Sequence, residues 1–240
     1  MESILQAQSV SRRFGAIRAV DAVSFSVPAT QVVALLGPNG SGKSTLLRMM
    51  CGYLQPTSGD IHIAGHSITQ APSLAKSCLS YVPDECELYE HMPVQQFLRF
   101  MGELKGVDKA HLGRRINEVI DDLSLAAVVK QQIGALSRGF RQRVAIAQAL
   151  LSGPSILLLD EPSNGLDLMQ VQQWYELMAT ISQRCAIVFT SHVFDDVVKL
   201  ADQVCLLSNG KLINQLSIDS SLSRENLEEL FLAELAVSTN

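Results

Sequence analysis

Hydrophobic and polar positions follow two different patterns in the first third of the chain. Alternation over Ile4–Val10 and Val20–Val27 predicts two antiparallel strands with one buried face. The run Gln31–Leu36 is mainly apolar and ends in a glycine-rich loop, so it predicts a buried strand. Ser44–Cys51 then predicts a helix that ends at Gly52. Further short strands are expected at Asp60–Ala64 and Leu79–Val82.

The pattern changes between about residue 85 and residue 153, where apolar positions recur at helical spacing. The expected helices are Val94–Leu104, with Pro93 in its first turn, Ala110–Leu123 and Arg141–Leu151. Strand-like runs then return at Ser155–Leu159, Ala186–Thr190 and Val204–Leu207, separated by helical segments at Gln170–Gln183 and Phe194–Leu200. This alternation predicts a mostly parallel sheet with a helical insertion. Arg224–Leu235 predicts a final amphipathic helix.

Composition restricts the classes of function. The chain has 240 residues, of which 47% are hydrophobic, so it can build a substantial core. The formal net charge is −5 and no run of Lys or Arg is present, which disfavours a general nucleic-acid binder. The five cysteines form no CxxC pair and are expected to be reduced thiols. The N-terminus lacks a signal pattern, and apolar runs such as Ile156–Leu159 are far shorter than the ~20 residues that span a bilayer, so any membrane role requires a partner.

A phosphate-binding loop is predicted between the buried strand and the first helix. Its residues, Gly37-Pro38-Asn39-Gly40-Ser41-Gly42-Lys43-Ser44, match G-x-x-x-x-G-K-[ST]. Glycines allow successive N–H groups to point at phosphate oxygens, and the helix directs its positive end at the same anion. Lys43 is expected to reach the β- and γ-phosphates, Ser44 to bind Mg²⁺ and Thr45 to add a phosphate contact.

Two carboxylates, Asp160 and Glu161, follow the apolar strand 156–159. In a P-loop NTPase a strand of this kind lies beside the phosphate-loop strand. Asp160 is then expected to bind Mg²⁺, and Glu161 to act as the general base that polarises the attacking water. Without the phosphate loop the same residues would indicate only a solvated acidic turn.

A third motif lies just before the acidic strand and consists of Leu136-Ser137-Arg138-Gly139-Phe140-Arg141-Gln142-Arg143. It resembles the signature motif of ABC ATPases, usually Leu-Ser-Gly-Gly-Gln, and most of the chain then follows the order of that family. Phe14 matches the aromatic residue that stacks on adenine, although packing as an ordinary strand aromatic is an equal alternative. Tyr81-Val82-Pro83-Asp84 matches the Q-loop, Ser163–Asp167 the D-loop and Ser191-His192 the switch histidine.

The resemblance implies an α/β fold: a P-loop NTPase with a RecA-like parallel-sheet core, an antiparallel β subdomain and an inserted α-helical subdomain. Residues 1–240 would form a single ABC ATPase domain with the helical insert at about 85–153 and a C-terminal helix at about 224–236. It also implies a dimer in which Ser137 and the Gly139 N–H bind the γ-phosphate of ATP held by a second ATPase subunit, either identical or different. His192 would contact the same phosphate.

Two motifs, the signature and the Q-loop, depart from the family pattern. The signature has Arg138 and Phe140 where Gly and Gln are usual, and Phe140 is expected to pack rather than to form hydrogen bonds. Asp84 stands where Gln usually contacts Mg²⁺; Asp84 can accept from a metal-bound water, and Glu85 is the alternative.

The signature and the segment 227–232 resemble the branch of ABC exporters whose ATPase is a separate chain. This implies a peripheral protein on the cytoplasmic face of the inner membrane, bound to an integral-membrane subunit that selects the cargo. Part of one apolar set in the insert must be core, and the rest is expected to border a groove for a cytoplasmic helix of that subunit, although burial of any single residue is an equal alternative: Val94, Phe97, Leu98, Phe100 and Met101. The alternatives are a soluble ABC ATPase of DNA repair, the ribosome or Fe–S assembly, and a small-molecule kinase, which the signature and His192 disfavour.

Overall fold

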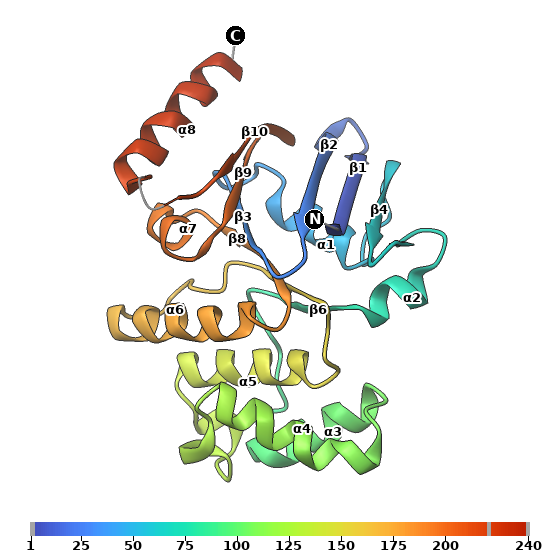
Figure 1. Ribbon diagram of the computed structural model, residues 1–240, viewed down its shortest axis with the longest axis vertical. Coiled ribbons are helices and arrows are strands. Elements are labelled where there is room, and N and C mark those ends of the chain that lie inside the picture. Colours follow the sequence, from blue (N-terminus) through green and yellow to red (C-terminus); the bar gives the residue numbers. More distant parts are fainter. Residues whose placement is uncertain (1–2, 220–221, 239–240) are drawn as a thin grey trace.

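The computed structural model describes residues 3–219 and 222–238, which form two sheets surrounded by helices (Figure 1). The larger sheet has the strand order β10-β9-β3-β8-β7-β6. Its strands are β3 (Val32–Leu36), β6 (Leu79–Val82), β7 (Ile156–Leu159), β8 (Ala186–Ser191), β9 (Gln203–Ser208) and β10 (Lys211–Ser217). All neighbouring strands pair in parallel except β10, which is antiparallel to β9. The predicted parallel sheet is confirmed.

Strand β3 lies near the middle of this sheet and all five of its residues are buried. Val33 and Leu35 belong to one core cluster, whereas Ala34 and Leu36 belong to another. Successive side chains of a strand point to opposite faces, so the two clusters lie on the two faces of the sheet. A strand covered on both faces has no polar positions to alternate with, which explains the continuous apolar run.

The smaller sheet is antiparallel, with the order β2-β1-β4-β5. Its strands are β1 (Ser3–Phe14), β2 (Ile17–Pro28), β4 (Ser58–Ile63) and β5 (His66–Ser67). Its buried side chains join the same cluster as Val33 and the buried residues of helix α1 (Lys43–Met50). The helix that carries the phosphate-loop lysine is therefore packed between the two sheets.

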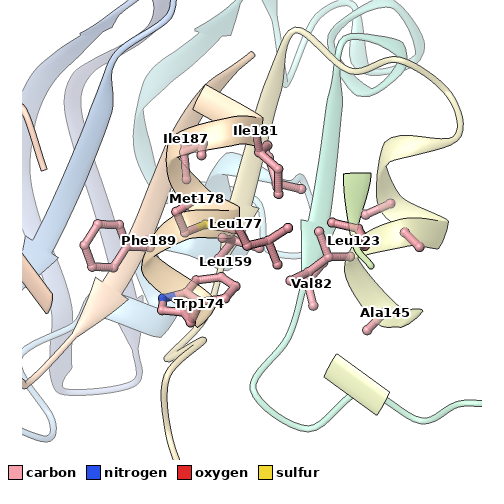
Figure 2. Packing of buried hydrophobic residues seen from close by; sticks show 14 of the residues in the cluster. Val82, Leu123, Ala145, Leu159, Trp174, Leu177, Met178, Ile181, Ile187 and Phe189 are labelled. Carbon is pink, nitrogen blue, oxygen red and sulfur yellow. The ribbon is translucent and has the colours of Figure 1, made fainter. Parts of the chain in front are cut away.

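Helices cover the other face of the large sheet and continue into a separate layer. They are α3 (Val94–Leu104), α4 (Lys109–Asp122), α5 (Arg138–Leu150), α6 (Leu168–Ser182), α7 (Phe194–Leu200) and α8 (Arg224–Ser238), with 3₁₀ turns at Ala126–Val128 and Ile133–Ala135. Helix α2 (Pro72–Ser77) instead packs on the side of the antiparallel sheet, where its Ala75 joins the same cluster as Val33. In Figure 1, α3, α4 and α5 lie at the end of the molecule opposite the antiparallel sheet. Figure 2 shows the core that joins this layer to the sheet, where Trp174 and Leu177 of α6 lie between Phe189 and Val82.

Several element boundaries differ from the sequence prediction. Helix α5 begins at Arg138 rather than Arg141, because the Ser137 side chain caps it. Pro93 occupies the capping position of α3 and not its first turn. Elements α2, β5 and β10 were not predicted; they are short or exposed on one side, so their hydrophobic pattern is weak.

The five cysteines are free thiols, as expected. Burial raises the pKa of Cys185 to about 11 and that of Cys205 to about 12, which keeps both protonated and unreactive. No helix in the described part of the chain is long and apolar enough to cross a membrane.

Candidate active site

The phosphate loop folds between β3 and α1, and its lysine is directed back beneath the loop. Lys43 is the first residue of α1 and is only 5% exposed. Its Nζ donates to the carbonyl oxygens of Gly37 at 2.7 Å and Pro38 at 3.2 Å. Ser41 is also buried, and its Oγ has no hydrogen-bond partner among the described residues. A buried cation and an unpaired hydroxyl therefore lie in a loop that can accept an anion.

Two glycines of this loop leave no room for a side chain. A Cβ on Gly42 would lie 2.4 Å from the carbonyl oxygen of Ala19, and the residue has a φ of +104°. A Cβ on Gly37 would lie 2.3 Å from the carbonyl oxygen of Leu207. The loop is thus pressed against backbone from β2 and β9, and only glycine permits this approach.

The expectation that the acidic strand lies beside the phosphate-loop strand is wrong, because β8 separates β7 from β3. The carboxylates at the end of β7 nevertheless lie beside the loop. Asp160 is 5% exposed, and its Oδ1 accepts from Ser44 Oγ at 3.1 Å and from Thr190 Oγ1 at 2.7 Å. Thr190 Oγ1 in turn accepts from the Glu161 backbone N–H at 2.7 Å. Glu161 has a φ of +46°, a left-handed conformation that is uncommon for a residue with a side chain. This turn of the backbone brings adjacent carboxylates, which would alternate in a regular strand, to the same site.

The predicted base and switch residue are in direct contact. Glu161 Oε2 lies 2.8 Å from His192 Nδ1, and Glu161 Oε1 lies 3.6 Å from Lys43 Nζ. His192 follows β8 directly and half of its side chain is exposed. The structure therefore brings together three residues that are widely separated in the sequence.

These groups surround a cavity of about 450 Å³, within the size range of small-molecule sites. Its lining residues are Ala19, Asn39, Gly40, Ser41, Gly42, Lys43, Ser44, Thr45, Asp84, Glu161, Asn164 and His192. The cradle of backbone N–H groups, the buried Lys43 and the unpaired Ser41 hydroxyl fit a nucleotide polyphosphate.

Of the three residues proposed for Mg²⁺, Ser44 and Asp160 contact each other directly through a hydrogen bond. Asp84, which lines the same cavity as Ser44, accepts from Asn164 Nδ2 at 3.4 Å. No cluster of three or more His, Cys, Asp or Glu ligands occurs within residues 3–219 and 222–238. A site with one carboxylate and one hydroxyl fits Mg²⁺, which commonly binds one or two carboxylates and completes its shell with phosphate oxygens and water.

The signature residues are not part of this cavity. Ser137 and Gly139 line a separate cavity of about 220 Å³ between α5 and α6, whose other residues are Phe140, Gln142, Arg143, Ile146, Leu166, Gln170, Gln173, Trp174 and Leu177. Phe140 packs against the core, as expected, and the Arg143 guanidinium lies 5.5 Å from its ring centre. Arg138 folds toward the D-loop, where its guanidinium would collide with a Cβ on Gly165.

Phe14 lies at the tip of the β1–β2 hairpin and is 43% exposed, so it does not pack as a core residue. Arg12 covers its ring at 4.6 Å from the centroid. On β2, Arg12 pairs with Val20. The Val20 side chain lies beside the phosphate loop, because a Cβ added to Gly42 would be 3.5 Å from it. The hairpin end that carries Arg12 and Phe14 therefore lies near the phosphate loop, and the Arg12 guanidinium and the Phe14 ring are in contact there.

Sequence reasoning assigned no individual role to two residues of the site, although it placed Asn164 in the D-loop. Thr190 connects Asp160 to the Glu161 backbone, and Asn164 contacts Asp84. Thr190 immediately precedes Ser191 and His192 at the end of a predicted strand, and this position beside the carboxylate strand was the available signal.

The sequence model of one family, described as ABC transporter, matches residues 20–164, which is more than half of the chain. The chain belongs to the ABC transporter family. It is an ABC-type ATP-binding domain, and the predicted ABC ATPase fold is confirmed.

Relatives of this ABC ATPase domain carry names of several transport systems. The ABC transporter ATP-binding protein YxlF of Bacillus subtilis is 35% identical over 87% of the chain and 69% of YxlF. Probable sulfate/thiosulfate import ATP-binding protein CysA of Chlorella vulgaris is 37% identical over 86% of the chain and 88% of its own length. Nod factor export ATP-binding protein I of Ralstonia nicotianae is 32% identical over 88% of the chain and 66% of its own length. The chain spans between 37% and 92% of the length of such relatives.

A solved structure of an ATP-binding subunit of an ABC transporter superposes with a TM-score of 0.84. The match covers 97% of this chain and 100% of that chain at 26% identity. The ABC ATPase arrangement therefore extends over nearly the whole molecule.

Proposed function

We propose that this ABC ATPase domain hydrolyses ATP as a dimer and drives transport through a separate membrane subunit. The observation that supports this most strongly is the division of the predicted site. The phosphate loop, Glu161 and His192 share one cavity, whereas Ser137 and Gly139 line another. A second ATPase subunit, the same or a related chain, would bring its signature residues to the γ-phosphate.

Each residue near the phosphate loop has a role in this proposal. Lys43 leaves the loop carbonyls and binds the β- and γ-phosphates. Ser44 and Asp160 would hold Mg²⁺, which would neutralise phosphate charge when bound. Before ATP binds, contacts with His192 and Lys43 hold the Glu161 carboxylate at the edge of the cavity. In hydrolysis Glu161 accepts a proton from the attacking water.

The remaining assignments concern the ends of the nucleotide. His192 donates a hydrogen bond to the γ-phosphate after leaving Glu161. Phe14 stacks on the adenine with its uncovered face, since Arg12 occupies the other. Asp84 accepts from a water on Mg²⁺, and Asn164 holds that carboxylate.

The helical layer offers a surface for the membrane subunit. Of the five apolar residues predicted here, Val94, Phe97 and Leu98 are buried and Met101 is partly buried. Phe100 is 39% exposed and contacts Tyr89 edge-to-face at 5.7 Å. Most of the set is therefore core. We assign the surface beside Phe100 and Tyr89 to a helix of the membrane subunit.

The direction of transport is proposed to be export, from the resemblance of the signature to exporter ATPases. The names of relatives include both import and export systems and do not decide the direction. The proposed location is the cytoplasmic face of the inner membrane, where the membrane subunit would hold the protein.

The test is a pull-down of tagged Glu161→Gln protein from its native cells in mild detergent with ATP. A multi-span membrane protein in near-equal stoichiometry is the expected result, and its loss from a Phe100→Glu variant would support the assigned surface. Recovery of only soluble partners, such as ribosomal, DNA-repair or Fe–S assembly proteins, would retain the ATPase and reject the transport role.

A further inference from the structure

A buried carboxylate lies behind the active site and does not line its cavity. Asp196, in the first turn of α7, is 3% exposed. Its Oδ1 accepts from Tyr175 OH at 2.8 Å, and its Oδ2 accepts from Ser191 Oγ at 3.3 Å and from Ser163 Oγ. Three hydroxyl groups from three separate segments therefore converge on one side chain.

The burial of the Asp196 carboxylate carries an energetic cost. In the part of the chain that the structure describes, no Lys, Arg or His nitrogen lies within 4.0 Å of Asp196 and forms an ion pair with it. A buried charge without a cation is costly unless every oxygen receives hydrogen bonds. Burial and the nearby Asp196 raise the pKa of Tyr175, so its hydroxyl remains a donor. The carboxylate is therefore tolerated only while these donors keep their places.

Two of the three donors lie next to the residues assigned to hydrolysis. Ser163 is two residues after Glu161, in the loop that leads to α6. Ser191 immediately precedes His192, and its Oγ also accepts from the Val193 N–H at 2.9 Å. Movement of either segment would break a hydrogen bond to Asp196 and leave the charge less compensated.

We infer that Asp196 is a positioning residue that fixes the Glu161 segment and the His192 segment relative to each other. This inference rests on the proposed function, because it assumes that Glu161 and His192 act in hydrolysis. The 2.8 Å contact between their side chains is the direct link at the front of the site, and Asp196 is the link behind it. Tyr175 anchors this carboxylate to α6, the helix that begins directly after the D-loop.

The experiment measures kcat and ATP affinity for Asp196→Ala and Asp196→Asn in the full chain. The matched control is Ser80→Ala, which removes a buried hydrogen bond to the Ala149 carbonyl at a residue that does not line the phosphate-loop cavity. We expect Asp196→Ala to lower kcat about 10- to 100-fold with less than a threefold change in ATP affinity. Asp196→Asn keeps one acceptor oxygen and the shape of the side chain, so its kcat is expected between those of Asp196→Ala and wild type.

A double-mutant cycle with Ser163→Ala tests the coupling. If Asp196 acts through Ser163, the loss caused by Ser163→Ala should shrink in the Asp196→Ala background. Three results would each overturn the inference. The first is that the kcat losses of Ser163→Ala and Asp196→Ala are independent of each other. The others are a kcat for both Asp196 variants equal to that of Ser80→Ala, and a fall in kcat proportional to the loss of folded protein. Glu161→Gln, measured in parallel, separates the two proposals: undiminished turnover there would reject the assigned base, whatever the Asp196 variants do.

Discussion

The phosphate loop permits a prediction that separates two effects of one extra methyl group. Gly42→Ala places a Cβ 2.4 Å from the Ala19 carbonyl oxygen in a residue with φ of +104°. Gly40→Ala, in the same loop, has φ of +80° and no atom within 4 Å of the new Cβ. Both variants carry the strain of a positive φ, and only Gly42→Ala also carries the collision. Gly40→Ala is therefore the matched control.

The expected magnitudes follow from these two contributions. A positive φ costs about 1–2 kcal/mol for a residue with a Cβ, and forcing an extra carbon into packed structure costs about 1–3 kcal/mol. Gly40→Ala should then lose about 1–2 kcal/mol of unfolding free energy and Gly42→Ala about 2–5 kcal/mol. A domain with about 5–15 kcal/mol of stability remains largely folded in Gly40→Ala, and it remains so in Gly42→Ala unless its stability lies at the lower end of that range.

The larger consequence is expected in ATP binding. To relieve the collision, the loop must move away from β2, and its N–H groups then lose their alignment toward the phosphates. Losing one hydrogen bond to a charged group costs about 1.5–3 kcal/mol, which corresponds to roughly 10- to 100-fold weaker binding. Urea denaturation and calorimetric titration with ATP measure the two effects. Equal unfolding free energies for the two variants, or unchanged ATP affinity in Gly42→Ala, would refute this reasoning.

The remaining predictions concern the base, the switch region, the adenine contact and the core. Glu161→Gln should keep ATP affinity and lower kcat about 10²- to 10⁴-fold; a normal rate in a turnover assay would reject Glu161 as the base. Thr190→Val removes the hydroxyl shared by Asp160 and Glu161, so kcat should fall about tenfold at a stability cost of about 1–3 kcal/mol, and unaltered kinetics would show that this link is dispensable. Phe14→Ala should raise KM for ATP without changing kcat, whereas Phe14→Trp should keep KM near the wild-type value. Equal KM values in wild type, Phe14→Ala and Phe14→Trp would argue against stacking. Phe189→Ala, at a site 1% exposed, should lower the unfolding free energy by about 3–5 kcal/mol, and a loss below 1 kcal/mol in urea titrations would contradict the tight packing of this core.

Much of the fold was determined by local sequence. The buried strand 32–36 and the helices 94–104 and 194–200 lie where the hydrophobic period placed them, because a strand covered on both faces and a helix with one apolar side leave clear patterns. The phosphate loop was also readable, since its glycines and Lys43 act within one strand–loop–helix unit. Short or half-exposed elements such as β10 leave a weaker pattern and were missed.

The relations between distant segments were decided only by the tertiary structure. Parallel pairing of β7 and β8 places Thr190 against Asp160 and His192 against Glu161, and no local pattern records such a contact. Likewise, three hydroxyls meet at Asp196 because α7 packs beside α6 at the end of the sheet. Sequence alone specified the chemistry carried by each segment, because that chemistry depends on residue type and local spacing. Which groups act together depends on the packing that brings the ends of separate strands to one edge of the sheet.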